Sequence, residues 1–194
     1  MENSITWGVV VAVLGVAFVL WVVRDKIRGK PVPDALRTGK RLPEFEAMDE
    51  DGNGVASRDL SGSPAVILFV RGTWCPFCSK QVANLTRYYK DINDLGAKLI
   101  LVTPKPLETT RRVAEMFGVD FDFWLDESLE VSKKLGLLQP AGVPKDQRGQ
   151  YGEDTLWPTS LVVDASGTIR FSELSRFIAD RPDPRKLLNA LQKL

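Results

Sequence analysis

The sequence lacks histidine altogether and has only two cysteines among its 194 residues. A structural zinc site needs about four ligands, mostly cysteine and histidine, so this chain cannot supply one. A c-type haem needs a histidine directly after the second cysteine, where Ser79 stands. One cysteine pair gives no framework of structural disulfides and does not reveal the redox compartment. We therefore expect neither a metal nor a bound cofactor.

A strong excess of either charge is also missing, since 26 basic and 25 acidic residues give a formal net charge of +1. The basic residues are unevenly placed: seven of them lie in 1–41 with three acidic residues, which leaves 42–194 mildly acidic. Such a domain has no basic surface for nucleic acid, and we expect no nucleic-acid partner. A chain of this length with 44% apolar residues can bury the core of one domain.

The two cysteines stand three apart in the motif Trp-Cys-Pro-Phe-Cys at 74–78, directly after the apolar run 65–70. The pattern predicts a strand followed by a helix, with Cys75 as the N-cap and Pro76 at the first helical position. The helix dipole and free N–H groups lower the pKa of a thiol placed there. Cys78, one turn later, can close a disulfide with Cys75. We predict a redox-active dithiol, and a pair of inert buried cysteines is the alternative.

Residues 5–23 contain no charged side chain, and as a helix they span roughly 28 Å, close to the hydrocarbon thickness of a bilayer. Trp7 and Trp21 lie near the ends of this run, where interfacial aromatics occur in membrane helices. No basic stretch precedes the run and no small-residue cleavage motif follows it, which argues against a cleaved signal peptide. We expect a transmembrane anchor in the lipid bilayer after a short tail, 1–4.

Residues 24–41 are basic and contain prolines and glycines, so we expect a linker there and a folded domain over 42–194. Only Glu2 and the α-amino group precede the expected anchor, whereas all seven basic residues of 1–41 follow it. The positive-inside rule then predicts a single-pass protein with its catalytic domain on the cytoplasmic face.

The pattern of apolar residues over 42–194 predicts an α/β domain. A hairpin with an Asp-Gly turn is expected in 42–62, and a long polar segment over 139–156 is either a gate for the active site or a disordered insertion. The other elements expected are strands at 65–70, 98–103, 121–125, 160–163 and 169–171, and helices at 76–94, 107–117, around 129–135 with a stop at Gly136, and 183–193.

Together these residues resemble the thioredoxin fold, and specifically its redoxin branch, the alkyl hydroperoxide reductase/thiol-specific antioxidant (AhpC/TSA) family. The resemblance covers 42–194. It rests on Leu-Pro-Glu-Phe at 42–45, the run 71–78, Asp-x-x-Gly at 164–167 and Arg-Pro-Asp-Pro at 181–184. It implies a central mixed sheet flanked by helices, with an N-terminal hairpin extension, and peroxiredoxin-like or thioredoxin-like redox activity.

The resemblance also implies a substrate groove. Thioredoxin-fold proteins carry a cis-proline that faces the disulfide, and Pro158 stands at the matching place before a strand. A cis-proline there would leave neighbouring backbone free to pair with a substrate strand. An ordinary trans proline is the alternative. The groove residues implied are Trp74, Pro76, Trp157, Pro158 and Thr159.

The sequence departs from the peroxiredoxin pattern at two positions. Peroxiredoxins carry a threonine three residues before the reactive cysteine and a downstream arginine that stabilises the thiolate. Gly72 occupies the threonine position, and Thr73 follows one residue later. The arginine position falls on or near Pro158. Arg71 and Thr73 are candidate thiolate stabilisers, and a surface charge is the alternative for Arg71. These departures put peroxidase activity in doubt.

We expect a membrane-tethered dithiol–disulfide oxidoreductase in which Cys75 attacks a substrate disulfide and Cys78 resolves the mixed disulfide. Its partner would be a protein thiol or disulfide, or a thioredoxin-type reductant. One alternative is a thiol peroxidase that reduces hydroperoxides, with Cys75 peroxidatic and Cys78 resolving. Glutaredoxin-like chemistry and a non-catalytic membrane assembly module are further alternatives.

Two questions stay open at the level of sequence. Without histidine, the group that moves protons has to be a carboxylate or water, and the candidates are Asp126, Glu127 and Asp154. Tethered thioredoxin-like proteins of bacteria often face an oxidising compartment, so a periplasmic or extracytoplasmic domain is the alternative to the cytoplasmic one.

Overall fold

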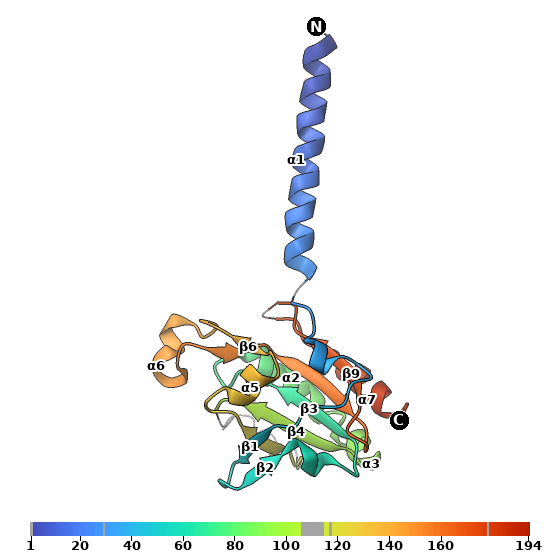
Figure 1. Ribbon diagram of the computed structural model, residues 1–194, viewed down its shortest axis with the longest axis vertical. Coiled ribbons are helices and arrows are strands. Elements are labelled where there is room, and N and C mark those ends of the chain that lie inside the picture. The colour runs from blue at the N-terminus through green and yellow to red at the C-terminus, as the bar shows by residue number, and fades with distance from the viewer. Residues whose placement is uncertain (1, 29, 106–114, 117, 178) are drawn as a thin grey trace. The chain divides into compact units, whose positions relative to one another are not determined.

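The computed structural model describes residues 2–28, 30–105, 115–116, 118–177 and 179–194. The chain divides into two compact units, Met1–Pro31 and Val32–Leu194. The first unit is the helix α1 (Glu2–Arg28), which is drawn in blue in Figure 1. In the part of the chain that the structure describes, no helix has the length and hydropathy needed to cross a membrane. The span that we expected over 5–23 is therefore not found there.

The second unit is built on a seven-stranded sheet in the order β2-β1-β5-β4-β3-β8-β9. Pairings of β3 with β4 and of β4 with β5 are parallel, and the other pairings in this sheet are antiparallel. Helices cover this mixed sheet (Figure 1), which confirms the predicted α/β class. The strands are β1 (Glu46–Asp49), β2 (Gly54–Ala56), β3 (Ala65–Phe69), β4 (Lys98–Thr103), β5 (Asp122–Leu125), β8 (Thr159–Val163) and β9 (Ile169–Leu174).

Strand β3 lies in the interior of the sheet and is apolar along its whole length because both of its faces are covered. Ile67 and Phe69 pack into one core, which includes residues of α5 (Glu130–Lys134). Val66 and Leu68 pack into a second core on the opposite face. The helices of that second core are α2 (Pro76–Thr86), α3 (Tyr89–Asp94) and α7 (Pro184–Leu191).

Most of the predicted elements are present. The single helix expected over 76–94 is divided into α2 and α3, and the hydroxyl of Thr86 donates to the carbonyl of Ala83 in the last turn of α2. A Ser/Thr side chain that bonds to a preceding carbonyl destabilises and bends a helix. The helix expected at 107–117 lies mostly outside the described residues.

The segment expected as a gate or a disordered insertion forms regular structure. It contains β6 (Leu138–Gln139), the 3-10 turn η3 (Lys145–Gln147), α6 (Arg148–Tyr151) and β7 (Thr155–Leu156). Strands β6 and β7 pair antiparallel as a separate two-stranded sheet. The segment is therefore not a disordered insertion, and its role as a gate for the active site stays a prediction.

Part of the expected linker packs onto the second unit. The 3-10 turn η1 (Asp34–Leu36) buries Leu36 completely in the first core. The N–H of Gly39 donates to the carbonyl of Ile169, and that of Leu42 donates to the carbonyl of Gly167. The compact domain therefore begins near Val32 rather than at residue 42.

Candidate active site

The dithiol lies at the carboxyl end of β3. Cys75 is the N-cap of α2, with extended backbone dihedrals (φ −97°, ψ 99°), and Pro76 takes the first helical position as predicted. Cys78 lies in the first turn of α2, and its N–H donates to the carbonyl of Cys75 at 3.0 Å. Both cysteines are free thiols, and the Cys78 Sγ donates to the Cys75 Sγ at 3.1 Å. Their exposed fractions are 1% for Cys75 and 0% for Cys78.

The environment shifts the pKa values of the two thiols in opposite directions. Hydrogen bonding from Cys78 lowers the pKa of Cys75 to about 6, assisted by the charges of Arg181 and Arg71 and opposed by burial. The same hydrogen bond, together with burial, raises the pKa of Cys78 well above its ordinary value. Near neutral pH, Cys75 is therefore a thiolate and Cys78 a thiol.

Arg181 brings a guanidinium to both sulfur atoms. Its Nη2 lies 3.2 Å from the Cys78 Sγ and 3.6 Å from the Cys75 Sγ. Its Nη1 donates to the carbonyl of Asp180 at 2.6 Å and to the Oγ of Ser175 at 3.1 Å. The chain thus supplies a cation at the dithiol from the connection between β9 and α7.

Sequence reasoning missed the role of Arg181. In the sequence, the Arg-Pro-Asp-Pro motif at 181–184 supports only the family resemblance and precedes the last helix. Within it, Asp183 is the N-cap of α7 and accepts a hydrogen bond from the Arg185 N–H. This cap fixes where the helix begins, and Arg181 precedes it by two residues. The motif indicates where the helix begins. It does not indicate that Arg181 contacts the dithiol, which lies about a hundred residues earlier in the chain.

Arg71 is buried, with 2% of its surface exposed, so the surface-charge alternative is wrong. Its Nε donates to the carbonyl of Leu156 at 3.2 Å, and its Nη2 donates to the Oε1 of Gln139. Its Cζ lies 5.9 Å from the ring centroids of both Trp74 and Trp157, within the range of cation–π attraction. Burial lowers the pKa of Arg71, and the charges of the two cysteines oppose that shift.

Thr73 and Gly72 lie against Tyr151 of α6, and the carbonyl of Gly72 also accepts a hydrogen bond from the N–H of Cys75 at 3.2 Å. The hydroxyl of Thr73 forms a hydrogen bond with the hydroxyl of Tyr151. Gly72 has φ +116°, and a Cβ there would lie 3.3 Å from Cε1 of Tyr151 and 3.6 Å from Cδ1 of Trp74. Only glycine adopts this backbone conformation without strain, and it also leaves room for the tyrosine ring. Residues 139–156 therefore hold the loop that precedes Cys75.

Only some of the residues expected to form a substrate groove reach the protein surface. No peptide bond in the described part of the chain is cis, so the bond before Pro158 is trans. Trp74, Pro76 and Trp157 reach the surface, whereas Pro158 and Thr159 are buried.

The backbone beside Pro158 is also occupied. The N–H of Trp157 donates to the carbonyl of Leu137, the Oγ1 of Thr159 donates to the carbonyl of Trp157, and the N–H of Ser175 donates to the carbonyl of Pro158. The backbone groups of Trp157 and Pro158 that a substrate strand would use are therefore already hydrogen-bonded within the protein. Free backbone was expected only beside a cis-proline, and the structure has the alternative, a trans proline with its neighbouring groups bonded.

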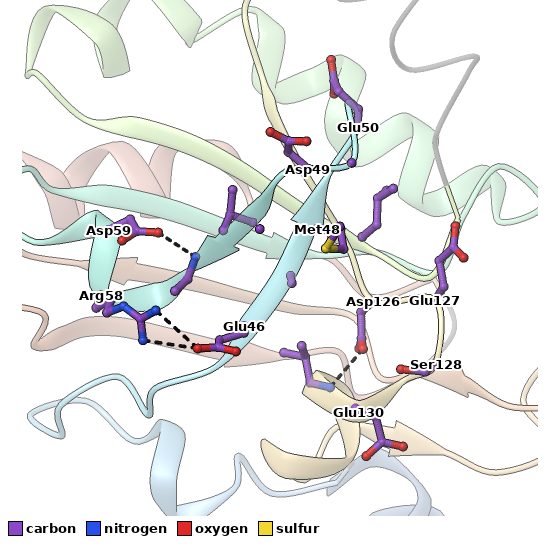
Figure 2. Close-up of a pocket in the computed structure, with 17 residues that line it drawn as sticks. Glu46, Met48, Asp49, Glu50, Arg58, Asp59, Asp126, Glu127, Ser128 and Glu130 are labelled. Atoms are coloured by element: carbon purple, nitrogen blue, oxygen red, sulfur yellow. Dashed lines mark hydrogen bonds and ion pairs between the residues drawn. The ribbon is translucent and has the colours of Figure 1, made fainter.

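Two carboxylate candidates for proton transfer lie in a different groove, of about 750 Å³, between the β1–β2 hairpin, the end of β5 and α5 (Figure 2). Asp126 and Glu127 line this groove, and neither cysteine does. Asp126 accepts hydrogen bonds from the N–H groups of Val131 and Ser132 and from the Ser132 hydroxyl, at 2.7–3.0 Å. Its carboxylate therefore binds the backbone and side-chain donors of the first turn of α5. Burial raises the pKa of this carboxyl group.

The third candidate, Asp154, accepts a hydrogen bond from the N–H of Ala141 within the 139–156 segment. In the described residues, the hydrogen-bonding side chain that touches the two sulfur atoms from outside the motif is that of Arg181. The geometry thus assigns none of the three carboxylates to the dithiol.

Comparison with known proteins agrees with this site. Residues 38–172 match the model of the AhpC/TSA family. The thiol-disulfide oxidoreductase ResA of Halalkalibacterium halodurans is 28% identical over 102 residues, which cover 52% of this chain and 57% of that protein. Peroxiredoxin Bcp of Escherichia coli is 25% identical over 134 residues, which cover 69% of this chain and 83% of that protein.

Solved structures show the same fold. Peroxidoxin BcpB from Mycobacterium tuberculosis superposes with a TM-score of 0.64 at 20% identity, over 82% of this chain and 98% of that one. The thioredoxin domain of a thiol-disulfide oxidoreductase from Bacteroides vulgatus gives a TM-score of 0.55 at 22% identity, over 81% and 97%. The second unit therefore has a thioredoxin-like fold. Because the family match extends over well more than half of the chain, the protein belongs to the AhpC/TSA family.

Proposed function

We propose that this protein is a dithiol–disulfide oxidoreductase that cycles Cys75 and Cys78 between the dithiol and the disulfide. The observation that supports this proposal most directly is the pair of free thiols at the start of α2, whose Sγ atoms lie 3.1 Å apart. The chain is a thiol-dependent oxidoreductase, and its relatives are named for disulfide exchange and for peroxide chemistry. The two sulfur atoms store the two electrons, so the proposal needs no cofactor.

In the exchange reaction, the Cys75 thiolate attacks one sulfur of a partner disulfide and releases the other sulfur as a thiolate. The Cys78 thiol, which already contacts the Cys75 Sγ, then loses its proton and attacks Cys75 in the mixed disulfide. The partner leaves as a dithiol, and the Cys75–Cys78 disulfide forms. Two electrons pass to the partner, which also takes up two protons, one from the Cys78 thiol and one from solvent because Cys75 starts as a thiolate. The reverse sequence restores the dithiol. The partner is a protein thiol or disulfide, or a thioredoxin-type reductant.

Substitution of each cysteine tests these roles. In Cys78→Ser, the mixed disulfide with a partner or a model disulfide should accumulate because nothing resolves it. In Cys75→Ser, disulfide exchange should be lost and no adduct should form. Mass spectrometry under non-reducing conditions reads both outcomes. Adducts that form on Cys78 when Cys75 is replaced would contradict the assignment, and full exchange without either cysteine would refute the function.

A second candidate function, thiol peroxidase, is favoured by the contact between Arg181 and the dithiol. A cation beside the thiolate stabilises charge as a hydroperoxide is attacked. Cys75 would take one oxygen and become a sulfenic acid while the alcohol leaves, and Cys78 would then condense with it and release water. Stopped-flow mixing of the reduced protein with a hydroperoxide separates the candidates, because a fast second-order reaction supports the peroxidase and a slow one supports disulfide exchange.

A membrane tether is the part of the proposal that rests on sequence alone. The uncharged run 5–23 with its terminal tryptophans is the basis for a single-pass anchor. Fractionation of cells that produce the full chain tests it: the protein should sediment with membranes and should resist extraction by carbonate. A reporter fused to the C-terminus distinguishes a cytoplasmic domain, which the charge bias favours, from an extracytoplasmic one. Recovery in the soluble fraction would refute the tether.

A further inference from the structure

The segment 139–156 holds the loop before the dithiol at two points, one on each side of Gly72. On one side, the guanidinium of Arg71 donates to a carbonyl and to a side-chain amide oxygen of the segment. On the other side, the hydroxyls of Thr73 and Tyr151 share a hydrogen bond. The loop that leads into α2 is therefore braced by a part of the chain that follows it by about seventy residues or more.

Tyr151 meets this loop with both its ring and its hydroxyl. A Cβ on Gly72 would lie 3.3 Å from Cε1 of the ring, and the hydroxyl bonds to Thr73. Phenylalanine could make the ring contact equally well, whereas only tyrosine supplies the hydroxyl. The hydrogen bond can therefore be tested separately from the packing.

Gly72 begins a four-residue turn that ends at Cys75. The N–H of Cys75 donates to the carbonyl of Gly72 at 3.2 Å, and Thr73 and Trp74 are the two central residues. The turn delivers Cys75 to the start of α2 with φ −97° and ψ 99°, and backbone dihedrals limit the rotamers that a side chain can adopt. A hydroxyl that holds Thr73 thus acts on the residue that carries the nucleophile.

Helix capping does not by itself fix the Sγ of Cys75. In the described structure its side chain makes no capping hydrogen bond to the backbone of α2, unlike the serine or aspartate side chains that usually cap a helix. The Sγ instead meets the Sγ of Cys78 at 3.1 Å. This contact between the sulfur atoms therefore depends on the turn that places Cys75, and on the groups that hold that turn.

We propose that Tyr151 is a positioning residue for the dithiol: through its hydrogen bond to Thr73 it holds the turn that sets the Cys75 Sγ against the Cys78 Sγ. The inference rests on the proposed function and deepens it, because it names the element that regulates the reactivity of that site. The hydroxyl of Tyr151 bonds to Thr73 and not to a sulfur atom, so it acts through the turn. The segment 139–156 thereby takes part in the reaction of Cys75 with a disulfide.

The pH dependence of the reaction between the reduced full chain and a dipyridyl disulfide tests the proposal. In Tyr151→Phe, the second-order rate constant near pH 6 should fall about three- to fivefold and the midpoint of the profile should rise, because a displaced Cys78 Sγ stabilises the Cys75 thiolate less well. Tyr89→Phe is the matched control, since the ring of Tyr89 packs edge-on against Phe121 in the second core. Its profile should not change.

Substitutions at Thr73 test the same hydrogen bond from its other end. Thr73→Val removes the hydroxyl and should reproduce the change seen in Tyr151→Phe. The double variant should change no further, because each single substitution already removes the one hydrogen bond. Thr73→Ser keeps the hydroxyl and should retain the unmodified profile. A role in stability alone would lower the free energy of unfolding in urea and leave the pH profile where it is.

An unchanged profile in a folded Tyr151→Phe variant would overturn the proposal and leave disulfide exchange intact. Additive effects of Tyr151→Phe and Thr73→Val would overturn it as well. Should Tyr151→Phe fail to fold, the difference between Thr73→Val and Thr73→Ser decides in the same way. Failure of the unmodified dithiol to react with the disulfide at any pH would instead refute the proposed function.

Discussion

The Nη2 of Arg181 lies 3.2 Å from the Sγ of Cys78, although 103 residues separate the two in the chain. The same nitrogen lies 3.6 Å from the Sγ of Cys75. The contact joins the start of α2 to the connection between β9 and α7. It places a positive charge where the thiolate forms, in a site from which water is largely excluded.

The first prediction concerns Arg181→Met. Loss of the guanidinium should raise the pKa of Cys75 above its present value of about 6, because one of the charges that favour the thiolate is removed. The ultraviolet absorbance of the thiolate, followed as a function of pH, measures the midpoint. Arg170→Met serves as the control, since Arg170 pairs with Asp164 at the surface. An unchanged midpoint in Arg181→Met would contradict the electrostatic role.

The second prediction concerns the stability of the reduced protein. The folded pKa of Cys75 is lower than its ordinary value near 9, so its ionisation adds stability that is complete above the ordinary pKa. This stability should be lost as the pH falls from about 9 to about 6, and it amounts to a few kcal/mol at about 1.4 kcal/mol per pKa unit.

Cys78 has the opposite dependence. Its folded pKa is raised, so the stability that it adds is present below the ordinary value and is lost as the pH rises above it. The reduced protein should therefore be most stable near pH 8 to 9. Urea unfolding at a series of pH values in the presence of a reductant measures this profile. Cys75→Ser should abolish the rise between pH 6 and 9, and its persistence would assign it to another group.

A third prediction concerns Gly72→Ala. The positive φ of Gly72 strains any other residue, and the new Cβ would press on the Tyr151 ring at 3.3 Å. We expect a loss of about 1–3 kcal/mol in the free energy of unfolding. Gly62→Ala is the control for strain alone, because Gly62 has φ +93° and no atom within 4 Å of the added Cβ. Equal losses in the two variants would show that the Tyr151 contact contributes nothing.

The fourth prediction concerns Asp126→Asn. The carboxylate accepts three hydrogen bonds at the first turn of α5, with the N–H and hydroxyl of Ser132 on one oxygen and the N–H of Val131 on the other. Asparagine keeps only one acceptor oxygen, so the substitution should lower the free energy of unfolding by about 1–2 kcal/mol. It should not alter the pH dependence of alkylation of Cys75, since Asp126 lies in the groove shown in Figure 2 and not at the dithiol. A shift in the alkylation midpoint would restore Asp126 as a candidate for proton transfer.

Local sequence patterns predicted much of the fold. The apolar run before Cys75 becomes β3, Pro76 begins α2, and the turn residues after Val163 join β8 to β9. Such features depend on neighbours in the chain, on backbone preferences and on the alternation of apolar side chains. The helix expected over 76–94 was wrong in its length, because the weak break at Thr86 has no strong sequence signal such as proline or glycine.

The position of the Cys75–Cys78 pair at a helix start follows from the sequence, because residue spacing and helix capping are local properties. The surroundings of that dithiol depend on the three-dimensional fold. Burial of Arg71, the approach of Arg181 and the packing of Tyr151 on Gly72 all join residues far apart in the chain. Such contacts arise from the order of strands in the sheet and from the path of the connections, so a single sequence holds no local signal for them.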